Sequence, residues 1–116
     1  MSQLTILHNP RCSKSRNALQ LLEDNKCDFK VIPYLEATPN KQELSHIIKL
    51  LGIKPSELLR TGEDIYKELN LKNEHDEDKI LDAMVAHPKL IERPIVIKGD
   101  KAVIGRPLEN VKELIK

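Results

Sequence analysis

A cysteine in a basic, polar segment is the residue of this chain best suited to chemistry. Cys12 lies in the run His8-Asn9-Pro10-Arg11-Cys12-Ser13-Lys14-Ser15-Arg16, where a predicted strand ends and a predicted helix begins. An ordinary thiol with a pKa near 8.5 is only about 3% thiolate at pH 7, and the thiolate is the nucleophile. The free N–H groups and the positive end of a helix dipole favour this anion, and basic neighbours add to the effect: Arg11, Lys14 and Arg16. A pKa lowered to about 6.5 would make roughly three-quarters of Cys12 thiolate at pH 7.

The two cysteines differ in their surroundings. The alternative for Cys12 is an inert packing cysteine, although its polar, basic neighbours favour a reactive thiol. Cys27 follows Asn25-Lys26 in a predicted helix-to-strand turn without a comparable basic cluster, so packing or an accidental surface position is favoured there. The pair has no Cys-x-x-Cys spacing, so Cys12 cannot resolve its own adduct locally. An external thiol is therefore implied.

Three distant arginines are candidates for binding an oxyanion: Arg60, Arg93 and Arg106. The chain has five Arg against fourteen Lys, and a planar guanidinium suits an oxyanion better than the point charge of lysine. The alternative for each of them is an ordinary surface arginine. A phosphatase-type Cys-x5-Arg loop is excluded, because the residue six positions after Cys12 is Ala18.

The elements around Cys12 predict an α/β fold. Residues 4–7, 13–24 and 29–32 are typical of strand, helix and strand, which indicates a parallel βαβ unit. Residues 94–97 and 102–104 indicate a hairpin around Gly99-Asp100, and Pro107 is expected to open a last helix.

The middle of the chain is predicted to be helical. Thr38-Pro39 is expected to begin a helix, as a cap residue followed by a proline at the first helical position. Leu44, Ile47, Ile48 and Leu51 follow the i, i+3, i+4, i+7 spacing, and Gly52 is expected to end the helix.

Without this middle segment the order is βαβ–ββα, which is that of a thioredoxin-like fold. We expect one domain over residues 1–116, with a mixed four-stranded sheet and a helical insert at about 38–90. Such sheets place function at the loop after the first strand, which contains Cys12.

Composition narrows the possible functions. Nineteen Lys and Arg against eighteen Asp and Glu leave a formal charge of +1 over 116 residues, which predicts neither nucleic acid nor a membrane surface as a partner. No apolar run approaches the roughly 18 residues of a membrane span, and a signal peptide is not apparent, so we expect a cytoplasmic protein. The acidic, His-containing stretch at 74–78 lacks zinc-type spacing, and we expect no metal.

Seven motifs along nearly the whole chain resemble the glutaredoxin-coupled arsenate reductase family, which belongs to a larger group that includes the Spx transcription regulators. They stand in register with that family: His8-Asn9-Pro10-x-Cys12-x-x-Ser15-Arg16, Tyr34-Leu35-Glu36, Leu58-Leu59-Arg60, Tyr66-Lys67-Glu68-Leu69, His87-Pro88, Arg93-Pro94-Ile95-Val96 and Gly105-Arg106-Pro107.

The resemblance implies a fold and a site. The fold is thioredoxin-like with a helical insert. The nucleophile falls on Cys12, and the oxyanion-binding arginines fall on Arg60, Arg93 and Arg106. Three supporting residues match as well: His8 near the thiol, Ser15 in the same motif, and Pro94 at the position of the cis-proline of thioredoxin-like folds.

The resemblance also implies a reaction. The Cys12 thiolate attacks arsenate, water leaves, glutathione attacks the adduct, and glutaredoxin takes the mixed disulfide as arsenite is released. Glutathione is a co-substrate, and no bound cofactor, metal or flavin is needed. Two alternatives stay open: a glutathione-dependent oxidoreductase on another oxyanion or mixed disulfide, and an Spx-like regulator that binds RNA polymerase. The second is disfavoured because Ser15 replaces the second cysteine of the Cys-x-x-Cys that Spx switching generally uses.

Overall fold

The computed structural model describes residues 4–105 and 108–115 of the chain. The chain divides into two compact units, one made of Met1–Ala37 with Arg93–Lys116 and the other of Thr38–Glu92. That the whole chain forms one domain stays a prediction.

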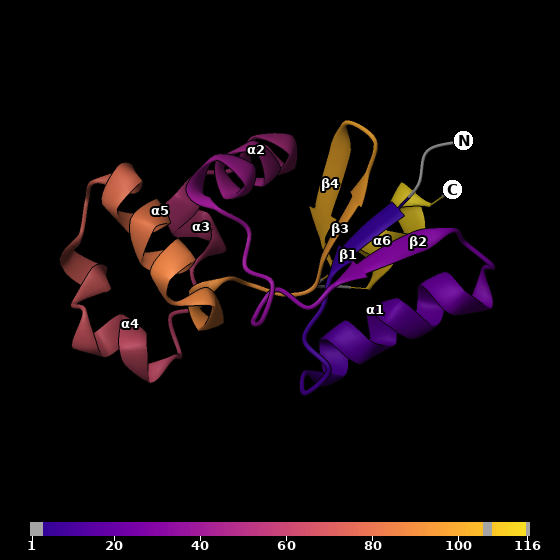
Figure 1. Cartoon of the computed structure of the whole chain (residues 1–116), viewed down its shortest axis with the longest axis horizontal. Helices are drawn as coiled ribbons and strands as arrows, with labels where there is room; N and C mark the ends of the chain where they lie inside the picture. The colour runs from indigo at the N-terminus through magenta and orange to yellow at the C-terminus, as the bar shows by residue number, and fades with distance from the viewer. Residues whose placement is uncertain (1–3, 106–107, 116) are drawn as a thin grey trace. The chain divides into compact units, whose positions relative to one another are not determined.

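The first unit contains a mixed four-stranded sheet in the order β2-β1-β3-β4 (Figure 1). Strand β1 is parallel to β2, with Leu7 opposite Ile32, whereas β1–β3 and β3–β4 are antiparallel. The predicted α/β sheet with βαβ and ββα halves is therefore confirmed. Its elements are β1 (Leu4–Leu7), α1 (Ser13–Asp24), β2 (Phe29–Ile32), β3 (Ile95–Lys98), β4 (Lys101–Ile104) and α6 (Glu109–Leu114).

Helices α1 and α6 share one hydrophobic core with the sheet. Leu4 and Ile6 of β1 point to the same face, because side chains alternate along a strand. They cluster with side chains from both helices and from β3, all of them buried: Ala18, Leu22, Val96 and Val111. This packing holds the start of α1 beside the end of β1, which is the position of Cys12.

The second unit is helical. Helices α2, α3 and α5 pack against one another, and the Lys41 ammonium of α2 makes ion pairs with Asp78 (2.9 Å) and Asp82 (3.0 Å) of α5. The elements are α2 (Lys41–Leu51), α3 (Pro55–Leu58), α4 (Asp64–Glu68), the 3-10 turn η1 (Leu71–Asn73), α5 (Glu77–Ala86) and the 3-10 turn η2 (Pro88–Leu90).

Helix α2 ends as predicted but begins later than predicted. Gly52 adopts the left-handed conformation (φ +71°) that ends the helix. The N-cap is Asn40 rather than Thr38. Asn40 forms a capping box with Glu43, in which its Oδ1 accepts the N–H of Glu43 at 2.8 Å and its own N–H donates to Glu43 Oε1 at 3.1 Å. The predicted start of the last helix at Pro107 lies outside the described residues.

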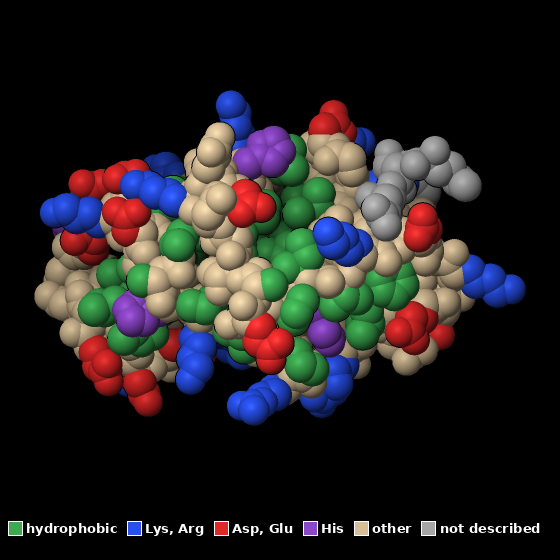
Figure 2. Space-filling view, in the orientation of Figure 1, with side chains coloured by type: hydrophobic (Ala, Val, Ile, Leu, Met, Phe, Trp, Pro, Cys, Tyr) green, Lys and Arg blue, Asp and Glu red, His purple; other side chains and the backbone are tan. Residues whose placement is uncertain are grey.

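Charged side chains of both signs are mixed over the face shown in Figure 2, in keeping with the formal charge of +1. Within residues 4–105 and 108–115, no helix has the length and apolar character required to cross a bilayer.

Candidate active site

The loop after β1 is held by its own hydrogen bonds. The N–H of His8 continues the sheet by donating to the Ile32 carbonyl at 2.9 Å. The side-chain oxygen of Asn9 accepts the N–H of Arg11 at 3.0 Å, and its carbonyl accepts the N–H of Cys12 at 3.0 Å. Asn9 thus forms the turn that leads the chain from β1 into α1.

Cys12 is the N-cap residue of α1, with an extended backbone (φ −97°, ψ 122°). Burial acts to raise the pKa of its thiol. Hydrogen bonds from the N–H groups of Ser15 and Lys14 and from the guanidinium of Arg93 act in the other direction, and the net pKa lies below that of an ordinary cysteine. The N–H groups of the first helical turn have no acceptor within the helix, so they are free to stabilise a thiolate.

Arg93 is brought to Cys12 by the start of β3. The Arg93–Pro94 peptide bond is cis, the conformation that the family resemblance implies, and the buried Pro94 accepts the N–H of Gly105 on its carbonyl at 2.8 Å. Burial acts to lower the pKa of Arg93, but the sulfur of Cys12 and the nearby Tyr34 raise it above its ordinary value. Arg93 therefore stays a cation beside the sulfur of Cys12.

His8 and Ser15 flank Cys12 in the chain and contact each other. Nδ1 of His8 is 2.6 Å from Oγ of Ser15, and both residues are buried. Burial and the positive charge of Arg16 lower the pKa of His8, and contact with Ser15 only partly opposes them. His8 is therefore largely neutral at pH 7, and the positive charge at the sulfur of Cys12 comes from Arg93.

Arg60 belongs to the second unit. Its Nη1 atom is 2.9 Å from Oε1 of Glu92, with exposed side-chain fractions of 24% and 27%. Backbone contacts hold Arg60 and Glu92 near each other. The N–H of Arg60 donates to the carbonyl of Leu90 at 2.8 Å, and Leu59 forms an isolated antiparallel β-bridge with Ile91. That Arg60 shares a site with Cys12 stays a prediction, and Arg106 lies outside the described residues.

Two residues of this region were not singled out by sequence reasoning. Asn9 holds the loop, and the signal for it was only the turn-forming pair Asn9-Pro10. Tyr34 is fully buried and acts on Arg93. The family resemblance included Tyr34 in the motif Tyr34-Leu35-Glu36 but assigned it no role. Among the described residues, no three His, Cys, Asp or Glu side chains are grouped in a way that would hold a metal ion.

The mixed four-stranded sheet with its βαβ and ββα halves defines a thioredoxin-like protein, and its first helix begins at a thiol whose pKa is lowered. The sequence profile of the ArsC family matches residues 7–114. An arsenate reductase of Neisseria meningitidis is 45% identical over 99% of this chain and 100% of its own length, and an uncharacterised Escherichia coli protein, YfgD, is 48% identical over 97% of each chain. The solved structure of an arsenate reductase from Vibrio cholerae matches with a TM-score of 0.92 and 45% identity over 97% of each chain. The chain belongs to the ArsC family, and it is an enzyme.

Proposed function

We propose that this enzyme reduces arsenate to arsenite, with the Cys12 thiolate as nucleophile and with glutathione and glutaredoxin as reductants. The similarity to proteins named arsenate reductases supports the substrate. The observation that carries the proposal is the pairing of Cys12 and Arg93, because it joins a stabilised thiolate to a guanidinium suited to a tetrahedral oxyanion.

In the first step the sulfur of Cys12 attacks the arsenic atom, and an arsenate oxygen leaves as water after taking up protons. The guanidinium of Arg93 neutralises the oxyanion that approaches the thiolate and the charge that develops on it. The family resemblance assigns Arg60 and Arg106 to the same task. Nε of Arg60 is buried and has no hydrogen-bond partner within the described part of the chain, which gives this guanidinium a spare donor for an anion.

The second step requires a thiol from outside the chain. Ser15 occupies the position of a nearby resolving cysteine, and Cys27 follows the far end of α1. The 12 residues of α1 span about 18 Å. The Cα atoms of a disulfide lie no more than about 7 Å apart, so Cys27 cannot close a disulfide with Cys12 in this fold.

Glutathione supplies this thiol in the proposed cycle. Its thiolate attacks Cys12 Sγ in the arsenic adduct, the S–S bond forms, and the S–As bond breaks. The bonding electron pair stays on arsenic, so As(V) becomes As(III) and leaves as arsenite while two thiols become one disulfide. Glutaredoxin then removes the glutathionyl group and restores the Cys12 thiolate. This chemistry fits the cytoplasm, where glutathione keeps thiols reduced.

Three further residues have supporting roles in this proposal. His8 and Ser15 hold the loop that presents Cys12, since their side chains meet at 2.6 Å. Pro94 positions Arg93, because the two residues share the peptide bond at the start of β3.

The test is NADPH consumption with arsenate, glutathione, glutaredoxin and glutathione reductase. We expect arsenate-dependent turnover that Cys12→Ser abolishes and Cys27→Ser largely retains. Equal loss in both variants would overturn the assignment of Cys12 as the sole essential thiol.

A wild-type protein without arsenate-dependent turnover, whose Cys12 still alkylates rapidly at pH 6.5, would overturn arsenate as the substrate. Another oxyanion or a mixed disulfide would then be the acceptor. If a pull-down with the folded, inactive protein recovers RNA polymerase, the result would point instead to a regulator of the Spx kind.

A further inference from the structure

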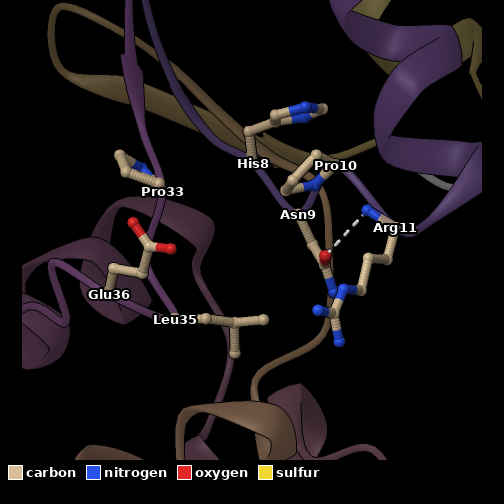
Figure 3. Close-up of a pocket in the computed structure, with 7 residues that line it drawn as sticks. All are labelled: His8, Asn9, Pro10, Arg11, Pro33, Leu35 and Glu36. Carbon is tan, nitrogen blue, oxygen red and sulfur yellow. Dashed lines mark hydrogen bonds between the residues drawn. The ribbon is translucent and has the colours of Figure 1, made fainter.

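A cavity of about 330 Å³ opens beside the thiol loop within the first unit (Figure 3). Its size falls at the lower end of the range for small-molecule sites, about 300–1,000 Å³. Residues of the loop after β1 face residues of the turn after β2 across the opening: His8, Asn9, Pro10 and Arg11 on one side, and Pro33, Leu35 and Glu36 on the other. Cys12 is the next residue after the first of these two segments.

The two sides of the cavity are placed by the sheet. Strands β1 and β2 are parallel, and their last residues, Leu7 and Ile32, are paired. Their loops therefore leave the same edge of the sheet, which is where ligands bind in open α/β sheets. The turn after β2 is fixed by the carbonyl of Pro33, which accepts the N–H groups of Glu36 (2.9 Å) and Ala37 (2.8 Å).

The cavity combines apolar walls with charges of opposite sign. Pro10, Pro33 and Leu35 supply the apolar surface, whereas Arg11 and Glu36 supply one positive and one negative group. Among the residues that the structure describes, neither the guanidinium of Arg11 nor the carboxylate of Glu36 makes an ion pair or a hydrogen bond. Both charges are exposed and available to a ligand that carries a carboxylate and an ammonium group.

The position of the cavity relative to Arg93 suits the cavity to the thiol that attacks Cys12. Arg93 reaches the sulfur from the start of β3, whereas the cavity lies on the side of β2, and β1 runs between these two strands. A thiolate that displaces arsenite from Cys12 must approach the sulfur roughly in line with the S–As bond. Because Arg93 holds the oxyanion on the β3 side of the sulfur, the β2 side stays open for the attacking thiolate.

We propose that this cavity binds the peptide thiol that cleaves the Cys12–arsenic bond, with a ligand carboxylate at Arg11 and the ligand ammonium at Glu36. The proposal rests on the proposed function, in which glutathione is that thiol, and it assigns to glutathione a place on the protein. In this step the S–S bond forms, the S–As bond breaks and arsenic takes the electron pair.

The test avoids arsenate, so it does not depend on arsenate being the substrate. Oxidised glutathione transfers a glutathionyl group to the Cys12 thiolate, with one S–S bond broken, one formed, and reduced glutathione released. Mass spectrometry measures the rate constant of this transfer, and also the rate constant with which Cys12 reacts with a neutral disulfide, hydroxyethyl disulfide. The ratio of the two rate constants cancels any change in the thiolate fraction of Cys12.

We expect Arg11→Gln and Glu36→Gln each to lower this ratio about two- to fivefold, the size typical of one exposed ion pair. The matched controls are Lys30→Gln on β2 and Glu23→Gln on α1, which are exposed and lie outside the cavity. Their ratios should move only with the overall charge, slightly down in Lys30→Gln and slightly up in Glu23→Gln.

The sign of the Glu36→Gln effect separates binding from general electrostatics. Glutathione disulfide is an anion overall, so removal of a distant negative charge would raise its rate constant, whereas removal of an ammonium ligand lowers it. An unchanged or raised ratio in Glu36→Gln, or an unchanged ratio in Arg11→Gln, overturns the proposal. A lowered ratio in both cavity variants supports it, even in a protein that shows no turnover with arsenate.

Discussion

Ser15 contacts His8 with its side chain and the sulfur of Cys12 with its backbone. Its Oγ atom lies 2.6 Å from Nδ1 of His8 and accepts the N–H of Asn9 at 3.0 Å, while its own N–H donates to the thiolate. The hydroxyl therefore fastens the loop after β1 to the first turn of α1. The anion, in contrast, is supported by a main-chain group that any residue at this position would provide.

Because the Ser15 hydroxyl holds the loop and its main-chain N–H contacts the sulfur, Ser15→Ala should affect stability more than thiol reactivity. The substitution leaves the buried N–H of Asn9 and the ring of His8 without their hydroxyl partner. Unmade buried hydrogen bonds of this kind cost about 1–3 kcal/mol, so the free energy of unfolding should fall by that amount in a urea titration. The alkylation rate constant of Cys12 at pH 7 should change less than twofold. A large loss of reactivity with unchanged stability would contradict this assignment.

The pH dependence of Cys12 should depend on Arg93. A lowered pKa keeps the thiol ionised at lower pH, so alkylation by iodoacetamide should decline only at a pH below that at which a cysteine in a short peptide loses its thiolate. Arg93→Gln removes a hydrogen bond and a positive charge that both lower the pKa, and the midpoint of the pH profile should therefore move to higher pH. An unmoved midpoint would remove Arg93 from the thiolate site.

Arg93→Lys is the matched variant, because it keeps the charge and loses the planar fork. We expect it to retain most of the low-pH alkylation but to lower kcat/KM for arsenate clearly. Wild-type kinetics in Arg93→Lys would contradict a role for the guanidinium in holding the oxyanion.

Glu92 should compete with the substrate for Arg60. Its carboxylate holds Nη1 of Arg60 at 2.9 Å, and the proposed function requires that guanidinium for arsenate. Glu92→Gln removes the competing charge, and KM for arsenate should fall about two- to fivefold, the scale of a partly exposed ion pair. Glu57→Gln, an exposed acidic residue of the same unit, is the control and should leave KM unchanged. A higher KM in Glu92→Gln would mean that the carboxylate orients Arg60 and does not compete for it.

Gly105 should tolerate no side chain. A Cβ atom there would lie 2.7 Å from Cγ of Pro94 and 3.1 Å from Cγ2 of Val111. Overpacking of this kind costs about 1–3 kcal/mol, so Gly105→Ala should lower the free energy of unfolding by that amount. Gly62→Ala, where an added Cβ meets nothing within 4 Å, is the control and should be nearly neutral. Equal stabilities of the two variants would show that Pro94 moves aside without cost.

Local patterns predicted the elements well where one periodicity dominated. Leu44, Ile47 and Ile48 are buried, as the helical spacing predicted, because that spacing places them on one face of α2. The start of the same helix was mispredicted. Thr38-Pro39 satisfies a general rule for helix starts, but the reciprocal bonds of Asn40 and Glu43 satisfy two backbone N–H donors at once and determine the observed boundary.

The candidate site was predictable only in part. The basic, polar neighbours and the predicted helix start pointed to Cys12 from local sequence alone. Its partner Arg93 was a candidate from residue type, with an ordinary surface arginine as the alternative, and only the family resemblance assigned it to the site. A contact so distant in the chain depends on the pairing of β1 with β3. Tyr34 was missed because a tyrosine in a turn carries no local sign that the fold will bury it near an arginine.

The hydrogen bonds from Lys14 and Ser15 to the sulfur have a consequence for how this site can change. Both donors belong to the main chain, so replacing either side chain leaves them in place. Substitutions of Lys14 that keep the N–H should therefore lower thiol reactivity less than Lys14→Pro, which lacks it. Mutation of Lys14 or Ser15 can thus vary the surface around Cys12 without removing these two main-chain donors, which lower the pKa of the thiol together with the side chain of Arg93.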